Sequence, residues 1–316
     1  MNFATIGHLD YEYRQNQISK NWENNEYIVS PEIDCTGAKG RIILLKISAK
    51  KIMESPRKLI RKKILKASCY AQEKYEVELI QLGGLTTSVT SGGLWLADQE
   101  DYCGFINHGD SFTAAITSQS VIKVMSKLKQ KPSEKTLSII GAYGIIGEAT
   151  SKILVPQFKH SVLIGRKKEK LMELEKNIKG NFETSINLDT NKSDVIVTAT
   201  SHPTSLLISD HLKKNAIVID VSQPPNLSLD VCTKRSDIVR IDGGYVDFPL
   251  KFYIPSVPKG KLLACIVEAI MQSQEKERCN HVGSIDLNHL NKTMIWAKKY
   301  GYTLNELTNF GKIIKL

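Results

Sequence analysis

From Lys135 onward, short apolar runs alternate with segments of helical spacing, and this alternation constrains the fold more than any other feature of the chain. The runs TLSII, SVLIG, DVIVTAT and AIVIDVS are rich in β-branched residues and too short to be core helices. Such alternation is typical of a parallel sheet covered by helices. The chain is therefore predicted to be an α/β protein, with this sheet in residues 135–255.

A glycine pattern follows the first of these strands. SIIGAYGIIGEA has glycines at 141, 144 and 147 between a predicted strand and a predicted helix. This G-x-x-G-x-x-G variant of the dinucleotide fingerprint lets the backbone approach a pyrophosphate at the helix N-terminus. Residues 135–255 are accordingly predicted to be a Rossmann-like domain. The alternative is a domain of this fold that binds no cofactor.

The next strand end predicts which dinucleotide binds. NAD enzymes carry an acidic residue there for the ribose 2′-hydroxyl, whereas this chain has Arg166 and Lys167. Cations suit a 2′-phosphate, so NADPH is the predicted cofactor. Two later strand ends, TATSHP and DVSQPP, are predicted to line the same crevice, although the second is equally compatible with a tight turn. The candidate cofactor residues are Gly141, Tyr143, Gly144, Ile145, Ile146, Gly147, Arg166, Lys167, Thr198, Ala199, Thr200, Val221 and Ser222.

The length of 316 residues suits two or three domains, and 41% hydrophobic residues suit a globular core. We predict an N-terminal α/β substrate domain in 1–134, the Rossmann-like domain in 135–255, and C-terminal helices in 256–316 that pack back on the first domain. The N-terminal domain is expected to hold strands at 4–9 and 40–48. Helices are expected at 55–80, at 111–131 and at 260–278, the last opened by Gly260.

Two loops in the N-terminal domain contain glycine and hydroxyl residues that suit contact with a ligand. The first, LGGLTTSVTSGG, offers backbone N–H groups and hydroxyls for a developing oxyanion, or is simply a tight turn packed inside the protein. The second, NHGD, precedes the helix expected from Ser111. The candidate substrate residues are Gly83, Gly84, Leu85, Thr86, Thr87, Ser88, Gly109 and Asp110.

The formal net charge of +10 suggests an acidic partner. Its densest run, PRKLIRKKILK at 56–66, is predicted to form an amphipathic helix with a basic outer face, with Ser55 as N-cap and Pro56 at the first helical position. A solvated helix face is the simpler interpretation. Nucleic acid is not expected, because the run has no interleaved aromatic residues.

The N-terminus has no basic region followed by an apolar one, and no apolar stretch approaches the roughly 18 residues of a membrane span. A soluble, cytoplasmic protein with no membrane span is therefore expected. The six cysteines have no repeated spacing and are predicted to be free thiols. Cys279 and His281 are too isolated to argue for zinc, so no metal site is predicted.

Cys265 lies within GKLLACIVEAIM, an apolar run expected to be helical. Taken alone, such a cysteine is more often a core side chain than a catalyst. A position near a helix N-terminus, with Lys259 and Lys261 nearby in sequence, would favour the thiolate form. The sequence alone leaves both interpretations open.

Several ordered blocks together resemble the NADPH-dependent long-chain acyl-[acyl-carrier-protein] reductases. The blocks are IGHL, RKILKASCYAQEKYEVELIQLGG, LGGLTTSV, the Gly-Asp turn with FTA, GAYGIIGEA, LIGR and LACIVEAI. The resemblance implies that Cys265, in the A-C-x-x-E-A motif, is the nucleophile. It attacks an acyl thioester, and hydride from NADPH then releases a fatty aldehyde. It also implies that an acidic acyl carrier protein docks on helix 56–66, with Arg57, Arg61, Lys62 and Lys66 as the expected contacts, and that another enzyme consumes the aldehyde.

The chain departs from that family at two places, where it has His108-Gly109-Asp110 and Val221-Ser222-Gln223-Pro224. These departures weaken the expectation for the identity of the acyl substrate more than the expectation for the reaction itself. His108 is either a proton donor or an ordinary loop histidine. Two other functions remain open: a shikimate-dehydrogenase-like oxidoreductase that passes hydride directly to a keto group, with Cys265 inert, and a non-catalytic protein that senses NADPH.

Overall fold

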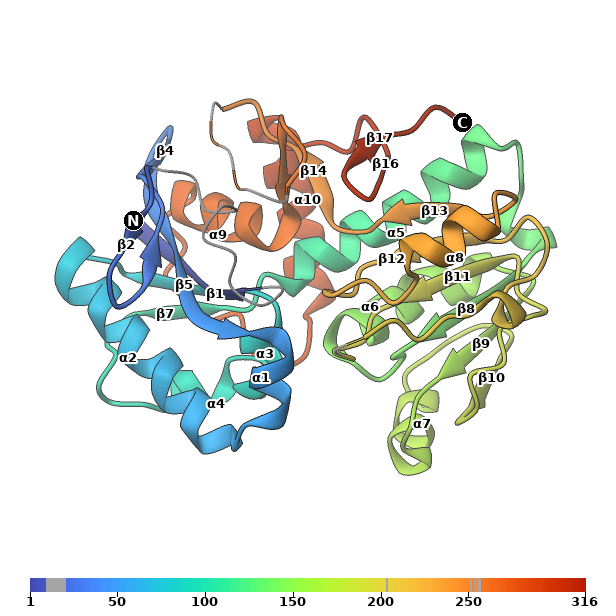
Figure 1. Cartoon of the computed structure of the whole chain (residues 1–316), viewed down its shortest axis with the longest axis horizontal. Helices are drawn as coiled ribbons and strands as arrows, with labels where there is room; N and C mark the ends of the chain where they lie inside the picture. Colours follow the sequence, from blue (N-terminus) through green and yellow to red (C-terminus); the bar gives the residue numbers. More distant parts are fainter. Residues whose placement is uncertain (10–20, 203, 251, 253, 255–256) are drawn as a thin grey trace. The chain divides into compact units, whose positions relative to one another are not determined.

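The computed structural model describes residues 1–9, 21–202, 204–250, 252, 254 and 257–316. These residues form two compact units. Unit 1 comprises Met1–Phe112 and Val246–Thr303, and unit 2 comprises Thr113–Tyr245 and Leu304–Leu316. Each unit is built around its own predominantly parallel sheet (Figure 1).

The sheet of unit 1 has strand order β2-β3-β5-β1-β6-β7, and β4 pairs with β5 off this path. β1, β5, β6 and β7 run parallel, whereas β2, β3 and β4 pair antiparallel. The carboxyl ends of the four parallel strands therefore lie at one edge of the sheet. The strands are β1 (Asn2–Leu9), β2 (Glu23–Asn24), β3 (Ile28–Val29), β4 (Ile33–Cys35), β5 (Ala38–Ser48), β6 (Leu79–Leu82) and β7 (Phe105–Asn107).

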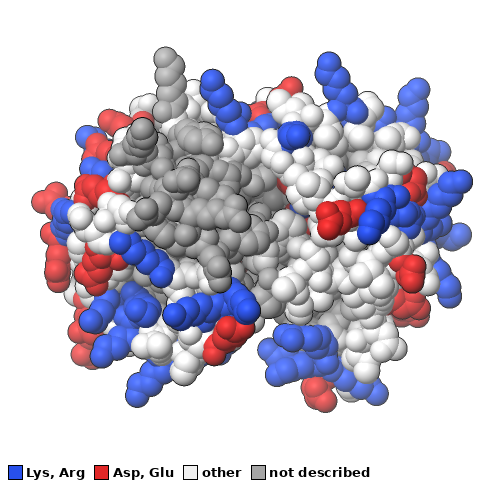
Figure 2. Space-filling model, in the orientation of Figure 1, with Lys and Arg blue, Asp and Glu red and all other residues white. Residues whose placement is uncertain are grey.

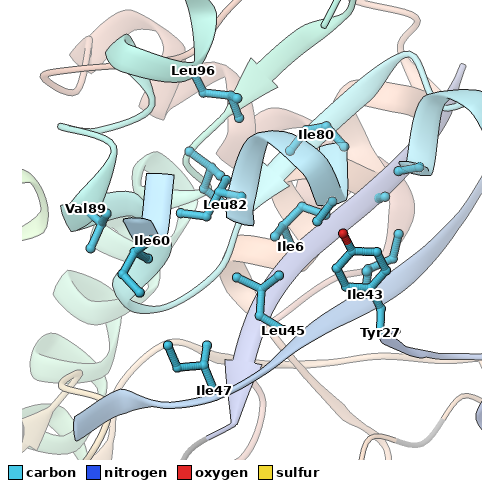
Figure 3. Close-up of a cluster of buried hydrophobic side chains, with 14 of the residues drawn as sticks. Ile6, Tyr27, Ile43, Leu45, Ile47, Ile60, Ile80, Leu82, Val89 and Leu96 are labelled. Atoms are coloured by element: carbon cyan, nitrogen blue, oxygen red, sulfur yellow. The ribbon is translucent and has the colours of Figure 1, made fainter. Parts of the chain in front are cut away.

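Helix α2 covers the sheet of unit 1 with an apolar stripe. Ile60, Ile64, Ala67 and Ala71 recur at helical spacing and are buried in one hydrophobic cluster with the strands. Figure 3 shows Ile6 and Leu82 of the sheet in this cluster together with Ile60. The helices on this part of the chain are α1 (Ala49–Glu54), α2 (Arg57–Tyr75), α3 (Leu85–Val89) and α4 (Leu94–Ala97).

The first turn of α2 differs slightly from expectation. Pro56 is the N-cap and the helix begins at Arg57, whereas Ser55 was expected as the cap. Ser55 instead forms the C-cap of α1, where its N–H donates to the carbonyl of Lys51. The two helices thus follow one another directly, and Ser55 and Pro56 form the short turn that ends α1 and begins α2.

Helix α9 (Ala264–Gln274) packs against β5, β1 and β6 of the same sheet, and α10 (Leu287–Tyr300) packs against α9. α9 is buried along most of its length, which explains its nearly continuous apolar sequence. The helix was expected to begin at Gly260, but it begins at Ala264. Gly260 lies in a turn at φ 77°, and β15 (Lys261–Leu263), which pairs with β14 (Tyr245–Asp247), separates it from the helix.

The sheet of unit 2 is wholly parallel, with strand order β10-β9-β8-β11-β12-β13. Numbered from its own first strand, this is the order 3-2-1-4-5-6 of the doubly wound dinucleotide-binding fold. The predicted α/β, Rossmann-like class is confirmed. The strands are β8 (Thr136–Ile140), β9 (His160–Ile164), β10 (Phe182–Ser185), β11 (Val195–Thr198), β12 (Ile217–Asp220) and β13 (Val239–Asp242).

Helices and a small hairpin complete unit 2. Val121, Val124 and Met125 of α5 are fully buried in the core of unit 2. Residues 113–134 therefore belong to unit 2, whereas the prediction placed them in the N-terminal domain. The other elements are α5 (Asp110–Lys127), η2 (Pro132–Glu134), α6 (Ile145–Leu154), η3 (Val155–Gln157), α7 (Lys168–Glu175), η4 (Ser209–His211), α8 (Leu229–Lys234), β16 (Thr308–Asn309) and β17 (Lys312–Ile313).

Two further boundaries differ from the predicted division. Residues 246–255 lie within the span assigned to unit 1, and 304–316 belong to unit 2. The second difference has a visible cause, because the N–H groups of Phe310 and Gly311 donate to the carboxylate of Asp242 at the end of β13. These contacts join the C-terminal hairpin to the sheet of unit 2.

All six cysteines lie among the described residues and are free, as predicted. Across the ranges that the structure describes, no helix combines the length and apolarity needed to cross a membrane.

Candidate active site

Cys265 is the second residue of α9, at the carboxyl-terminal edge of the unit 1 sheet. Leu263 occupies the N-cap position and has no side-chain acceptor, so the first N–H groups of the helix have no cap from that residue. The backbone amides of Cys265 and Ile266 interact with the thiol and favour its negative charge. Parallel α/β sheets bind their ligands at this edge.

Gly109 lies directly against Cys265. A Cβ atom added to Gly109 would be 2.5 Å from Cβ of Cys265 and 2.7 Å from its Cα. Gly109 also has φ 72°, a left-handed conformation that side chains other than glycine rarely adopt, and its N–H donates to Oδ1 of Asn107 at 2.5 Å. The turn after β7 can therefore approach the cysteine this closely only with glycine at 109.

The thiol of Cys265 is held in its neutral form, contrary to the expected thiolate. Burial first, and then the carboxyl groups of Asp110 and Glu268, together raise the pKa of Cys265 to about 12. The lysines do not compensate: Lys261 is buried and paired with Asp247, and Lys259 is exposed. The sequence argument failed because it weighed the helix terminus and the lysines but not the burial.

Asp110 and His108, on either side of Gly109, both favour their neutral forms. Burial, together with the charge of Glu268, raises the pKa of Asp110 well above its usual range. Burial lowers the pKa of His108 to about 4. The N–H of Asp110 donates to Nδ1 of His108 at 3.0 Å, so Nε2 of His108 carries the proton.

Glu268, one turn after Cys265 on α9, connects α9 to Phe112 and to α10. Its Oε2 accepts from the N–H of Phe112 at 2.7 Å, which satisfies a free donor in the first turn of α5. Its Oε1 accepts from Nε2 of His289 on α10 at 3.1 Å. Burial alone would raise the pKa of Glu268, but the hydrogen bond and charge of His289, the charge of His108 and the N–H of Phe112 together outweigh it and lower that pKa. A buried carboxylate thus lies close to Cys265.

The loop that begins at Gly83 forms α3, and most of its polar groups are used inside the protein. Thr86 donates to the carbonyls of Ile6 and Gly83, and Thr87 donates to that of Leu82. Both threonines are buried. These contacts favour the packed-turn interpretation for the two hydroxyls, and leave Gly84 and Ser88 as the exposed members of the loop.

His8 fixes the same loop from β1. Its Nε2 accepts from the N–H of Leu85 at 3.1 Å, and its Nδ1 lies 2.9 Å from the carbonyl of Leu9, so Nδ1 carries the proton. A Cβ on Gly84 would be 2.7 Å from this ring. The histidine of the IGHL block therefore positions the glycine loop.

In unit 2, each glycine of the fingerprint occupies a position that a larger side chain would obstruct. A Cβ on Gly141 would be 2.4 Å from the carbonyl oxygen of Ala199, and one on Gly147 would be 2.1 Å from that of Gly141. Gly144 is the N-cap of α6, and its lack of a side chain leaves the helix N-terminus open. This is the strand, turn and helix geometry that receives a pyrophosphate.

The predicted 2′-phosphate residues lie at the end of β9. Gly165, Arg166 and Lys167 connect β9 to α7, and both basic side chains are exposed. A Cβ on Gly165 would be 2.3 Å from the ring of Tyr143, so this ring packs on the backbone of the same turn. Tyr143 thus joins the glycine turn to the basic pair.

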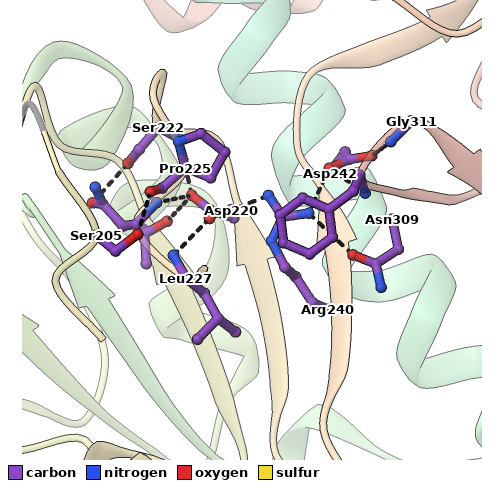
Figure 4. A network of polar contacts seen from close by, with 12 residues as sticks. Ser205, Asp220, Ser222, Pro225, Leu227, Arg240, Asp242, Asn309 and Gly311 are labelled. Atoms are coloured by element: carbon purple, nitrogen blue, oxygen red, sulfur yellow. Dashed lines mark hydrogen bonds and ion pairs between the residues drawn. The ribbon is translucent and has the colours of Figure 1, made fainter. Parts of the chain in front are cut away.

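The later strand ends form a buried polar network (Figure 4). Thr198 donates to Asp220 at 2.6 Å, and Arg240 donates to the other carboxylate oxygen at 3.2 Å. Ser222 accepts from the N–H of Thr200 and donates to Asn226. Thr198 and Ser222 are buried, so they shape the strand ends, and the turn interpretation is favoured for Ser222.

Sequence reasoning missed Glu268 and His289 as site residues, and it missed Asp220 and Arg240 as supports. An acidic residue one turn after a cysteine in an otherwise apolar helix was a usable signal for Glu268, because a buried carboxylate needs a partner. The partner itself, His289, lies on a different helix, and no local pattern identifies it.

The fold and these sites define a class: an α/β protein with a Rossmann-type unit and a second unit that presents a cysteine at a sheet edge. Comparisons with known proteins found several similar chains. Residues 123–242 match the family model described as Shikimate / quinate 5-dehydrogenase. Shikimate dehydrogenase from Aquifex aeolicus is similar in structure with a TM-score of 0.41 and 17% identity, over 76% of this chain and 86% of that one.

Two of the curated proteins that are similar in sequence follow. One is aminotransferase PigE from a Serratia species, 26% identical over 252 residues, which are 75% of this chain and 29% of that protein. The chain thus spans less than a third of the length of this relative. The other is the long-chain acyl-[acyl-carrier-protein] reductase of Synechococcus elongatus, 24% identical over 303 residues, which are 85% of this chain and 88% of that protein.

Proposed function

We propose that the chain is an NADPH-dependent oxidoreductase that reduces an acyl thioester to an aldehyde through an acyl group carried on Cys265. The dehydrogenase family match to unit 2 supports the oxidoreductase class. The observation that carries the finer proposal is the position of Cys265 at a helix N-terminus and a sheet edge, against Gly109. The similarity to an acyl-[acyl-carrier-protein] reductase, which extends over most of both chains, supports the same reaction.

The residues of unit 2 fit the cofactor. The three glycines leave room that a Cβ would fill, and the N-terminus of α6 is open toward an anion. Arg166 and Lys167 are exposed at the strand end where the 2′-phosphate of NADPH would lie. When bound, NADPH supplies the hydride that brings a thioester to the aldehyde level.

Cys265 performs the covalent step in this proposal. Its sulfur attacks the thioester carbonyl, a new carbon–sulfur bond forms, and the donor thiol leaves with a proton. Once the acyl carbon had been reduced, the bond to Cys265 would break, the aldehyde would depart and the sulfur would take up a proton. The balance is one thioester, one NADPH and one proton converted to one aldehyde, one thiol and one NADP⁺.

The neutral thiol must lose its proton before it attacks, and we assign this exchange to Asp110. Asp110 adjoins Gly109, and its carboxyl group is close enough to Cys265 to raise the pKa of the thiol. Asp110 can accept this proton only in its ionised form, because the neutral form already holds one; once ionised, its raised pKa makes it a stronger proton acceptor than a surface carboxylate. His108 is neutral and carries a proton on Nε2, so it is a candidate to donate a hydrogen bond to the oxyanion that develops at the thioester carbonyl.

Mass spectrometry of the acylated protein tests the proposal. Incubation with a long-chain acyl thioester in the absence of NADPH should add one acyl group, and peptide mapping should locate it on Cys265. Cys265→Ser should give no adduct, whereas Cys103→Ser, at an exposed cysteine of the same unit, should react like the parent. The absence of an adduct, combined with full activity of Cys265→Ser, would exclude covalent catalysis.

The second candidate is direct hydride transfer to a keto group, as the family match to shikimate and quinate dehydrogenase suggests. The raised pKa of Cys265 favours this candidate, because a neutral thiol is a poor nucleophile. It predicts that Cys265→Ala still oxidises a hydroxy acid with NADP⁺. A protein that only senses NADPH would bind the cofactor and turn over neither substrate.

We further propose that α2 docks an acidic acyl carrier protein. Figure 2 shows basic side chains gathered where Figure 1 draws α2, with some acidic ones among them. Arg57, Lys62 and Lys66 are exposed on this helix. Arg61 has a structural role instead: its guanidinium donates to the carbonyl of Val89 and to Ser91.

Charge reversal at two of the exposed positions tests the docking proposal. Lys62→Glu with Lys66→Glu should raise KM for an acyl-carrier-protein substrate by about tenfold or more and leave KM for acyl-CoA unchanged. Lys298→Glu with Lys312→Glu makes the same change of net charge at exposed positions elsewhere and is the matched control. Equal effects of both pairs, or equal effects on both substrates, would exclude α2 as the docking surface.

A further inference from the structure

The loop between α9 and α10 brings together three side chains that bind metal ions. One ligand atom each from Glu277, Cys279 and His281 lies within 4.8 Å of the other two. Nε2 of His281 is at the centre, 3.0 Å from Oε2 of Glu277 and 3.3 Å from Sγ of Cys279. We propose that these three residues form a binding site for a thiophilic divalent cation, with Zn²⁺ as the best-matched ion.

The donor set and the spacing both fit Zn²⁺. Thiolate, imidazole and carboxylate are its common protein ligands, at about 2.3 Å for sulfur and 2.0–2.2 Å for nitrogen and oxygen. Around a tetrahedral ion these lengths put neighbouring ligand atoms about 3.3–3.6 Å apart. The two distances that involve His281 are within about 0.4 Å of that range, and the separation of the Cys279 and Glu277 ligand atoms is no more than 4.8 Å, so small side-chain movements bring all three to an ion.

The backbone that carries these ligands is held in place from outside the loop. Gln272 of α9 donates to the carbonyl of Glu277 at 3.1 Å and to that of Cys279 at 2.8 Å. His281 is hydrogen-bonded to the chain around β7 through both of its backbone groups. Its N–H donates to the carbonyl of Ile106, and its carbonyl accepts from the N–H of His108. A site fixed in this way avoids most of the ordering cost of binding.

The imidazole of His281 is oriented as well. It stacks on the ring of His289, with centroids 3.3 Å apart and planes 11° from parallel, and His289 is held in turn by Glu268. Metal-binding histidines are normally oriented by a hydrogen bond from the other ring nitrogen, and here the ring stack restricts the imidazole. The stack directs Nε2 of His281 toward Glu277 and Cys279.

Charge and access are also compatible with an ion. Lys292 pairs with Oε1 of Glu277, so Oε2 is the oxygen that faces His281. A thiolate and a carboxylate would contribute two negative charges to the site, which a divalent cation balances. Cys279 is exposed, which gives an ion and a fourth ligand from solvent a route to the site.

Metal uptake by the chelator-treated full-length protein tests this site without using any enzyme assay. One equivalent of Co²⁺ should give the intense absorption of a cysteine-bound tetrahedral ion, and Zn²⁺ should displace it. Cys279→Ser and His281→Gln should each weaken Zn²⁺ binding by about tenfold or more in competition with a chromophoric chelator. Glu277→Gln should weaken it as well.

Two cysteine variants are the matched controls. Cys103→Ser removes an exposed thiol of the same unit, and Cys265→Ser removes the proposed nucleophile; neither should change uptake. Urea midpoints of all variants establish that they are folded. The proposal is overturned if the parent protein binds no Co²⁺ or Zn²⁺, or if Cys279→Ser retains full uptake. Because the readout is binding, this result is independent of the reaction that Cys265 performs.

Discussion

The close approach of Gly109 to Cys265 predicts a specific cost for Gly109→Ala. The new methyl carbon would have to share space with Cβ, Cα and the carbonyl oxygen of Cys265, at 2.5–2.7 Å. These atoms belong to the second residue of a buried helix, and two of the three belong to its backbone. Neither the turn after β7 nor the start of α9 can move without disturbing its own hydrogen bonds.

The magnitude follows from two separate contributions. The left-handed backbone at φ 72° costs an alanine about 1–2 kcal/mol, and overpacking of a tight contact costs about 1–3 kcal/mol more. The free energy of unfolding of unit 1 should therefore fall by about 2–5 kcal/mol. Gly37→Ala isolates the first contribution, because Gly37 has φ 84° and no atom within 4 Å of the added Cβ.

Urea unfolding followed by tryptophan fluorescence measures this difference. All three tryptophans, Trp22, Trp95 and Trp296, lie in unit 1, so the signal reports on the unit that contains the substitution. Gly109→Ala should be less stable than Gly37→Ala by about 1–3 kcal/mol. Equal destabilisation of the two variants would mean that Gly109 does not touch Cys265, and the active-site geometry would be wrong.

Three further results are expected. With a thiol pKa of about 12, alkylation of Cys265 in the resting protein should be slow at neutral pH and accelerate about tenfold per pH unit up to pH 11; a plateau near pH 9 would contradict the raised pKa. Arg240→Met leaves the buried carboxylates of Asp220 and Asp242 without their cation and should lower the free energy of unfolding, followed by circular dichroism, by about 3–5 kcal/mol. A loss below about 1 kcal/mol would refute the pairing. Gly141→Ala forces a methyl group against the carbonyl of Ala199 and should weaken NADPH binding by about tenfold or more in a fluorescence titration; unchanged affinity would remove the turn from the cofactor site.

Unit 2 could be predicted from the sequence because its information is local. Each strand is a short apolar run, and the fingerprint glycines lie within seven residues of one another. The division of the chain could not be predicted in the same way. The helix from Asp110 to Lys127 has a continuous helical pattern, and nothing in that pattern shows that its core contacts are with unit 2.

The pairing of strands in unit 1 could not be predicted, since β1 lies between β5 and β6, whose residues come much later in the chain. The surroundings of Cys265 had the same difficulty. Asp110 and Glu268, which both raise the pKa of the thiol, are far apart in the sequence. The partner of Glu268 is His289, on a third helix. Sequence indicated which cysteine to examine, but only the fold showed its protonation.

The route of the chain through unit 1 has a consequence for how the protein is made. Residues 1–112 supply the strands and the α2 side of the sheet, but the helix that carries Cys265 comes from 246–303. A ribosome therefore completes every strand of the unit 2 sheet before α9 can cover the other face of the first sheet. The nascent chain must keep that apolar face protected during the delay, and Cys265 meets Gly109 only after the strands of the unit 2 sheet have been synthesised.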